Sequence, residues 1–352
     1  MNLKSLKLRN FRNHEELSVE FTDDTTLITG PNGSGKTSIL EAIYCLYRGG
    51  SFRSSDVDII QSEKDWYYIE AHDNSGSRSL GYRVTELAKE KKFTVDSVKH
   101  SRLPAKLKQP IVLFTPDDLQ LLTGSPARRR RYIDTVITQL HPEYGTALRR
   151  YERALSQRNK LLKQPGVSPD TLFSWNVVLS EYGSTIINRR VEMSERIDTM
   201  VTDYYRRISS NQDVISVHYS AAAVSAQKLL GLLERSYDTD RLQGVTTVGP
   251  HRHDLAIQVN GKPAAATASR GENRTMILAL KQLEAELLEG TFGASPVVLL
   301  DDVFSELDNL RQGGLVKYFS DYQTIVASVN VGSSANASVS VVELGLPTDS
   351  SG

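Results

Sequence analysis

Cysteine is almost absent from this sequence, because Cys45 is the only one in 352 residues. A single thiol cannot form a disulfide within the chain, which excludes a disulfide-stapled fold and predicts a reducing, cytoplasmic setting. Long apolar runs are missing too, since no stretch approaches the roughly 18 apolar residues of a membrane-spanning helix. The first eight residues alternate polar and apolar types, as in a strand, and lack the apolar core of a signal peptide. We therefore expect a soluble protein with no membrane partner.

An excess of one charge sign is also missing. The 42 Lys and Arg balance the 42 Asp and Glu, so the chain as a whole does not attract an acidic polymer. One segment departs from this balance, because residues 102–163 hold 13 Lys and Arg against 5 Asp and Glu, an excess of eight. Any contact with DNA is predicted there, through phosphate contacts that are largely indifferent to base sequence.

The candidate DNA contacts in this segment are side chains of predicted helices. They are Arg128, Arg129, Arg130, Arg131, Arg149, Arg150, Arg153, Arg158 and Lys160. Four consecutive arginines at a helix start point in several directions, so the alternative is that some pair with acidic groups such as Asp134 or Glu152. Aromatic residues do not interleave with the basic run in a way that indicates base stacking. The segment therefore favours a grip on duplex backbone or on a junction.

A strand, a glycine-rich loop and a helix follow one another near the start of the chain. Residues 25–29 are typical of a strand, residues 30–37 are Gly-Pro-Asn-Gly-Ser-Gly-Lys-Thr, and residues 39–46 have apolar positions at helical spacing. Backbone N–H groups must wrap a phosphate chain without obstruction, and a helix N-terminus adds its dipole, so this order predicts a P-loop that binds ATP. The alternative is a glycine-rich turn that only joins a strand to a helix.

Each residue of this loop has an expected role. The predicted nucleotide-binding residues are Gly30, Pro31, Asn32, Gly33, Ser34, Gly35, Lys36, Thr37 and Ser38. The glycines leave the backbone free to approach the phosphates, and Lys36 reaches the β- and γ-phosphates. The Thr37 hydroxyl is predicted to ligate Mg²⁺.

The second half of the site is predicted at the end of an apolar run late in the chain. Residues 297–300 are Val-Val-Leu-Leu, as in a buried parallel strand, and Asp301 and Asp302 follow. Mg²⁺ needs a carboxylate nearby, which makes Asp301 the predicted metal-side group. Asp302 is placed to orient or deprotonate the attacking water, so Lys36 and Asp302 are the predicted catalytic residues. By itself, the pattern equally suits a strand end with solvated charges.

The middle of the chain changes from strands to helices. Stretches such as 66–71 and 80–84 predict a peripheral antiparallel layer. From 127 to about 209, two apolar stripes at helical spacing flank a Pro- and Gly-containing breaker at 164–169, which predicts an antiparallel helical hairpin.

Strand signals then return. Residues 245–248 and 254–259 predict two strands, the second followed by a turn at Asn260-Gly261. A helix is predicted from about 272 to 289, and residues 339–344 favour a final strand.

A short motif precedes the predicted helix at 272–289. Residues 268–272 are Ala-Ser-Arg-Gly-Glu, and here the sequence resembles the ABC-type ATPases, whose Ser-x-Gly-Gln-like signature lies just upstream of the acidic strand. Ser269 and Gly271 match signature positions, Glu272 replaces the usual Gln and Arg270 replaces a glycine. In that family the signature helix of one subunit points at the γ-phosphate held by the other. The resemblance therefore implies an ATP-dependent homodimer, although a serine before a helix is also an ordinary N-cap.

A further motif of the same family follows the acidic pair. Residues 305–308 are Ser-Glu-Leu-Asp and resemble the D-loop, with Ser305 and Asp308 at its matching positions.

The resemblance narrows to the RecF family of bacterial recombination mediators at motifs spread over the chain. These are Asn-Phe-Arg-Asn at 10–13, Leu-Phe-Thr-Pro-Asp-Asp-Leu at 113–119, the segment from Gly124 to Arg131, Gly-Pro-His-Arg at 249–252, and the segment 301–308. RecF is similar to SMC-type ATPase heads without their long coiled coil, which agrees with the predicted hairpin. Two departures are His253, where an acidic residue is expected, and the lack of a switch histidine at 328–330.

The resemblance implies an α/β fold, an ABC-type P-loop ATPase head with a mixed sheet and an antiparallel layer, plus an inserted helical lobe. We predict the head at 1–125 and 213–352 and the lobe at 126–212.

The resemblance also implies a function. It is that of an ATP-dependent DNA-binding protein of recombinational repair, a slow, DNA-stimulated ATPase with Mg²⁺ that helps to load recombinase at gaps. Its implied partners are duplex DNA or a single-strand/double-strand junction, and RecR with RecO. The alternative is the ATPase subunit of another ABC-type assembly, in transport or chromosome maintenance. A P-loop metabolic kinase would leave the signature and the D-loop unexplained.

Overall fold

The computed structural model describes residues 2–209, 211–302, 317–329 and 339–345. Its contacts divide the chain into two compact units. One is formed by Met1–Leu119 with Glu284–Gly352, and the other by Gln120–Leu283. Among the helices described, none is long and apolar enough to cross a membrane.

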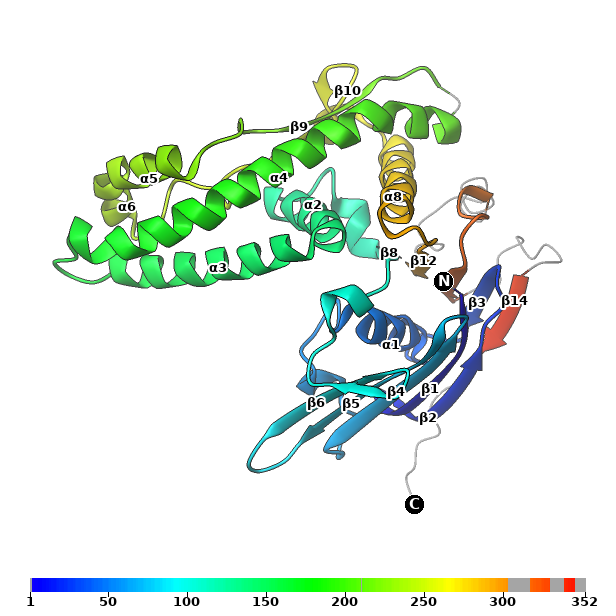
Figure 1. Ribbon diagram of the computed structural model, residues 1–352. Coiled ribbons are helices and arrows are strands. Elements are labelled where there is room, and N and C mark those ends of the chain that lie inside the picture. Colours follow the sequence, from blue (N-terminus) through cyan, green and yellow to red (C-terminus); the bar gives the residue numbers. More distant parts are fainter. Residues whose placement is uncertain (1, 210, 303–316, 330–338, 346–352) are drawn as a thin grey trace. The chain divides into compact units, whose positions relative to one another are not determined.

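The elements of both units follow in chain order (Figure 1). The helices are α1 (Lys36–Arg48), α2 (Pro126–Leu140), α3 (Pro142–Leu162), α4 (Pro169–Ser209), α5 (Ala226–Arg235), α6 (Tyr237–Gln243), α7 (Ala264–Thr267) and α8 (Arg270–Phe292). The strands are β1 (Leu3–Phe11), β2 (His14–Glu20), β3 (Thr25–Thr29), β4 (Trp66–Asp73), β5 (Gly76–Val84), β6 (Lys89–Val95), β7 (Val98–His100), β8 (Ile111–Phe114), β9 (Ile215–Tyr219), β10 (Leu255–Val259), β11 (Lys262–Pro263), β12 (Val297–Asp301), β13 (Thr324–Ser328) and β14 (Val339–Glu343).

A parallel sheet forms the centre of the first unit, with strand order β14-β3-β13-β12-β8. Strands β3, β12 and β13 are buried at every position, as expected for parallel strands that are covered on both faces of a sheet. Because β3 and β12 both pair in parallel with β13, their carboxyl ends reach the same edge of the sheet. The glycine loop follows β3 and Asp301 ends β12, so the topology brings the two predicted halves of the site to one edge.

The second sheet of this unit is antiparallel, with strand order β2-β1-β4-β5-β6-β7. Along β4 and β5, alternate residues are buried, as expected for a sheet with one face on the core and one toward solvent. Helix α1 contacts strands of both sheets and buries Cys45 between them. The predicted α/β head with its antiparallel layer is confirmed.

A long helical hairpin dominates the second unit. Helices α3 and α4 lie side by side, as Figure 1 shows, and confirm the hairpin predicted from the two apolar stripes. Strand β9 packs on α4 and pairs with β10. The turn into β11 uses Asn260 and Gly261, both at positive φ (50° and 76°), as the Asn-Gly pair predicts.

One predicted strand is wrong, because residues 245–248 form no strand. The backbone N–H groups of Thr246 and Thr247 donate to the side chains of Asn159 and Asp240, each at 2.8 Å. These backbone donors are therefore paired with side chains of the helical unit and not with a neighbouring strand.

The predicted domain limits of 126 and 212 stay a prediction. The contacts group residues 213–283 with the helices because β9 lies against α4 and carries β10 with it.

Candidate nucleotide site and basic surface

The loop at the end of β3 is shaped by its glycines. Gly30 and Gly33 have φ values of 153° and 85°, which side chains rarely adopt. A Cβ at Gly30 would lie 2.6 Å from the carbonyl oxygen of Leu344, so the end of the sheet leaves no room for one. The ammonium of Lys36 folds over the loop and donates to the carbonyls of Gly30 (2.8 Å) and Pro31 (2.9 Å). The predicted residues thus form one continuous loop that runs into α1.

The two predicted metal-side groups meet at the edge of the parallel sheet. The Thr37 hydroxyl, in the first turn of α1, donates to Oδ1 of Asp301 at 2.7 Å. Burial raises the pKa of Asp301, and the hydrogen bond from Thr37 opposes that rise. A hydroxyl and a carboxylate are hard oxygen ligands of the kind that Mg²⁺ takes beside nucleotide phosphates. This pair therefore fits a magnesium ion bound between protein and phosphate.

Asp302 lies just past the end of β12. Its φ of 52° places the backbone in the left-handed region, and its N–H donates to the carbonyl of Ala327 at 3.0 Å. Asp and Asn are the side chains that tolerate this conformation best after glycine. The backbone thus turns out of the strand immediately after Asp301.

The signature segment belongs to the second unit, at the start of α8. The N–H of Ser269 donates to the Glu272 carboxylate (2.7 Å), and the N–H of Glu272 donates to the Ser269 hydroxyl (3.2 Å). This reciprocal pair is a capping box, which explains why Glu can stand where the family has Gln. Ser269 and Arg270 are exposed, and Gly271 and Glu272 are half-buried. The D-loop positions Ser305 and Asp308 lie outside the described residues.

Two of the four consecutive arginines on α2 are held by His253 and Asp254. Arg129 donates to both carboxylate oxygens of Asp254, at 2.8 and 2.9 Å, and Arg130 donates to the carbonyl of His253 at 2.7 Å. His253 also lies 3.0 Å from the Tyr219 hydroxyl, and burial lowers its pKa. Asp134, a candidate partner of the arginine run, is bound instead by Arg190. His253 and Asp254, which directly follow the motif at 249–252, therefore anchor the start of α2.

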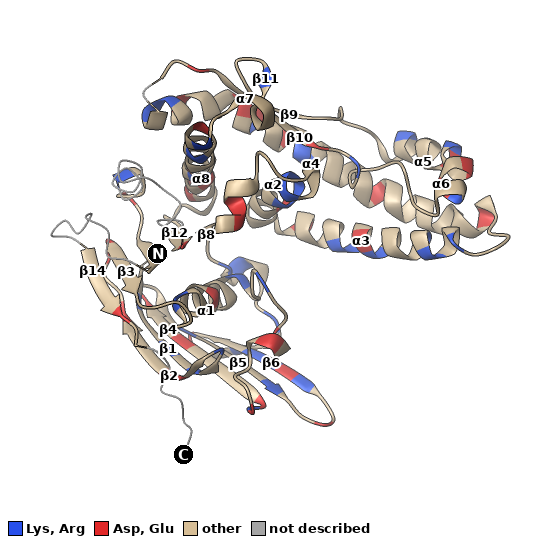
Figure 2. Cartoon of the chain, turned by 180° about the vertical axis from the view of Figure 1, so that it is seen from behind, with Lys and Arg blue, Asp and Glu red and all other residues tan. Residues whose placement is uncertain are grey.

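The remaining candidates for DNA contact differ in exposure. Figure 2 shows basic positions along α2 and α3. Arg128 is half-buried, whereas Arg131, Arg149, Arg150, Arg153 and Lys160 are exposed.

Arg158 is fully buried, with 0% of its surface exposed, and forms an ion pair with Asp240 at 2.6 Å. The prediction that Arg158 contacts DNA is wrong, because its guanidinium is used inside the helical unit.

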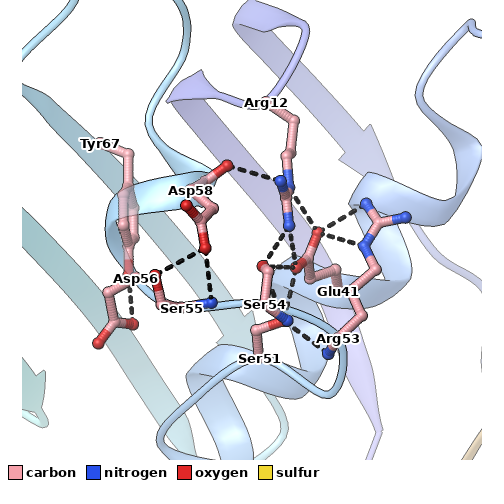
Figure 3. A network of polar contacts seen from close by, with 9 residues as sticks. All are labelled: Arg12, Glu41, Ser51, Arg53, Ser54, Ser55, Asp56, Asp58 and Tyr67. Atoms are coloured by element: carbon pink, nitrogen blue, oxygen red, sulfur yellow. Dashed lines mark hydrogen bonds and ion pairs between the residues drawn. The ribbon is translucent and has the colours of Figure 1, made fainter.

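Sequence reasoning missed a polar network beside the glycine loop, shown in Figure 3. Glu41 on α1 is fully buried and is bound by Arg12 at 2.7 Å and by Arg53 at 2.7 Å. Burial raises the pKa of Glu41, but hydrogen bonds from Arg12, Arg53 and Ser51 outweigh it and lower the pKa to about 2. The available signal was an acidic residue within the apolar run 39–46. Arg53 thus pairs with Glu41 although its own side chain is 37% exposed.

Known proteins resemble this chain over nearly its whole length. A family model described as an AAA domain matches residues 5–160. DNA replication and repair protein RecF of Natranaerobius thermophilus is 34% identical, over 94% of this chain and 92% of that protein. The RecF of Agathobacter rectalis is 36% identical over 93% and 91%, and that of Oceanobacillus iheyensis is 32% identical over 99% of each chain.

Solved structures also resemble this chain over nearly its whole length. The recombination mediator RecF with ATP, from the RecFOR pathway, superposes with a TM-score of 0.83 at 28% identity, covering 99% of this chain and 96% of that one. An Smc head bound to the C-terminal winged-helix domain of ScpA has a TM-score of 0.52 at 16% identity, over 95% and 91%, and shows a shared fold.

Proposed function

This chain belongs to the RecF family of DNA replication and repair proteins, and from that premise we propose that it is an ATP-dependent DNA-binding protein that dimerises on ATP. Its P-loop residues 30–38 bind the triphosphate, and Lys36 neutralises the β- and γ-phosphates. Slow hydrolysis, stimulated by DNA, then returns the protein to its open form. ATP favours the closed dimer through contacts that exist only while the γ-phosphate is present.

One observation carries the nucleotide site, namely the 2.7 Å contact between the Thr37 hydroxyl and Asp301. It joins the start of the P-loop helix to the end of the acidic strand, as a site for a metal-bound phosphate requires. When bound, Mg²⁺ supplies charge neutralisation for the phosphate oxygens. Thr37 and Asp301 would hold it, directly or through water, and Asp302 would orient the attacking water.

Each site of the dimer is completed by the signature of the partner. The exposed Ser269 hydroxyl, the backbone at Gly271, which carries no side chain, and the N-terminus of α8 together offer donors and a helix dipole to an anion. The capping box keeps this end of α8 ordered before any partner arrives.

The exposed arginines of α2 and α3 provide the phosphate contacts with duplex DNA or a junction. By its family membership, the protein works in the cytoplasm with RecR and RecO and helps to load recombinase at gaps.

Light scattering tests the central proposal. The full chain is measured with ATP, with ADP and without nucleotide, each with and without a short duplex DNA. We expect a doubling of molar mass with ATP alone and a further increase when DNA is present. A mass that stays monomeric with ATP under all conditions contradicts ATP-dependent dimerisation.

Two variants separate the binding step from the closing step. Lys36→Ala should weaken ATP binding by about 100-fold or more, because it removes a charge-assisted contact to the phosphates. Ser269→Arg should bind ATP as the wild type does and remain monomeric, since the bulky cation blocks the site of the partner. Ser225→Arg is the matched control, because Ser225 is an exposed N-cap on another helix. Normal dimerisation of Ser269→Arg would rule out a shared site.

A further inference from the structure

The chain between β1 and β2 contacts the glycine loop through two consecutive side chains, those of Asn13 and His14. Asn10, near the end of β1, and Arg12, in the turn, have positive φ values of 51° and 56°, so the backbone bends sharply without glycine. The turn is fixed from the other side by hydrogen bonds from the Arg12 N–H to Ile59 (2.8 Å) and from the Gln61 N–H to Asn10 (3.0 Å). A turn held in this way presents Arg12, Asn13 and His14 in defined positions.

Asn13 and His14 grip the loop by its carbonyl groups. The Asn13 amide donates to the Gly33 carbonyl at 2.8 Å, and Nε2 of His14 lies 3.2 Å from the Gly35 carbonyl. Burial lowers the pKa of His14, so the neutral ring with a proton on Nε2 is the form that donates here. The neighbouring Arg12 forms an ion pair with Glu41 of α1 (Figure 3), which fixes this helix to the turn.

The packing at this contact is tight. A Cβ on Gly35 would lie 2.2 Å from Nε2 of His14 and 2.5 Å from Oδ1 of Asn13. The two side chains therefore occupy the space that any residue other than glycine would need. Gly35 is required here by contact with the turn as well as by its φ of 92°.

The direction of these contacts matters for phosphate binding. In a trans peptide, the C=O and the following N–H point to opposite sides. The Gly35 carbonyl is held by His14 and also accepts from the N–H groups of Ser38 (2.9 Å) and Ile39 (3.3 Å) of α1, so the N–H of Lys36 points away from the turn, where a phosphate oxygen can accept it. The structure thus fixes the donor geometry of the loop before nucleotide binds, which reduces the entropy lost on binding.

We propose that Asn13 and His14 are positioning residues that hold the phosphate loop in its binding conformation. The inference rests on the proposed function, since it assumes that nucleotide binds to this loop. Neither residue needs to touch nucleotide, because each acts through a glycine carbonyl. These contacts affect how tightly ATP binds and not the chemical step. The Kd and KM for ATP therefore rise when a contact is lost, while kcat at saturating ATP changes little.

Substitutions that remove or restore the hydrogen-bond donor at positions 13 and 14 test the proposal. Asn13→Asp keeps the shape but offers only acceptors to the Gly33 carbonyl, so it should weaken ATP and ADP binding at least as much as Asn13→Ala, by about three- to tenfold. His14→Ala should show a similar loss, and His14→Gln, whose amide can donate, should recover most of it. Glu15→Ala is the control, because Glu15 is the next residue of the same strand and is exposed.

The measurement is titration of each full-length variant with fluorescent ATP and ADP, together with steady-state kinetics and thermal unfolding without nucleotide. Asn13→Asp binding as well as wild type, or His14→Gln no better than His14→Ala, would overturn the proposal even if an alanine variant failed to fold. Wild-type protein that bound no ATP would instead contradict the proposed function itself, so the two failures are distinguishable.

Discussion

Thr37 and Asp301 are separated by 264 positions in the chain and yet share a hydrogen bond. Each could be assigned a role from its own surroundings, because a glycine loop between strand and helix and an acidic strand end are local patterns. The network on Glu41 could not be assigned in this way, since its ligands come from positions 12, 51 and 53. Single residues were predictable where the chemistry lies in one segment, and not where it depends on tertiary pairing.

Substitution of Asp302 by Asn tests its role as the group that orients water. Asparagine has nearly the same shape and tolerates the positive φ of 52°, so the fold should be preserved. Without a carboxylate to accept the proton, turnover should fall by about 100-fold or more, while ATP binding and dimerisation remain. Phosphate release and light scattering on the same samples check this. Undiminished hydrolysis would remove Asp302 from the chemical step.

Among the elements, α3 and α4 depend on a buried polar centre. The guanidinium of Arg158 is bound by Asp240 (2.6 Å), Asn176 (2.7 Å) and Thr246 (2.8 Å), and neither charged side chain is exposed. This centre joins the hairpin to α6 and to the segment that follows it. It also explains why the strand predicted at 245–248 does not form. Val and Thr generally favour strands, but here the backbone N–H groups donate to side chains of the helices instead of to a neighbouring strand.

Arg158→Ala should therefore destabilise the helical unit strongly. The change leaves Asp240 buried without its cation, which typically costs about 3–5 kcal/mol. Arg153→Ala, an exposed position on the same helix, should change the free energy of unfolding by less than about 0.5 kcal/mol. Urea denaturation in a Trp66→Phe background isolates Trp175 on α4, since the chain has two tryptophans. Equal stability of the two variants would contradict the importance of the pair.

At the scale of the whole molecule, a chain without net charge is proposed to bind DNA, so the contacts must be local. The sequence identifies a basic segment but could not separate exposed arginines from those used internally. Arg149, Arg150 and Arg153 on α3 are exposed, whereas Arg129 is held by Asp254. Charge counting identifies a segment, and only the fold tells which of its side chains face solvent.

Replacing Arg149, Arg150 and Arg153 together by Ala should weaken DNA binding equally for different base sequences. Each lost phosphate contact should make the negative slope of log affinity against log salt concentration less steep by about 0.9. The control replaces Lys228, Arg235 and Arg241, which are exposed outside the basic segment and remove the same charge. Fluorescence anisotropy with labelled duplex across a salt series makes the comparison. Equal losses in both triple variants would indicate a general charge effect and not a binding surface.

The order of strands in the parallel sheet has a consequence for synthesis on the ribosome. Strand β3, which carries the phosphate loop, pairs only with β13 and β14 within this sheet, and both are translated at least 295 residues after it. While the nascent chain grows through the helical unit, β3 therefore has neither of the neighbours that flank it in the finished sheet. The helical unit ends at Leu283, 41 residues before β13 begins. A chain that ended before β13 would contain the helical hairpin but lack both strands that flank the phosphate loop strand in the sheet.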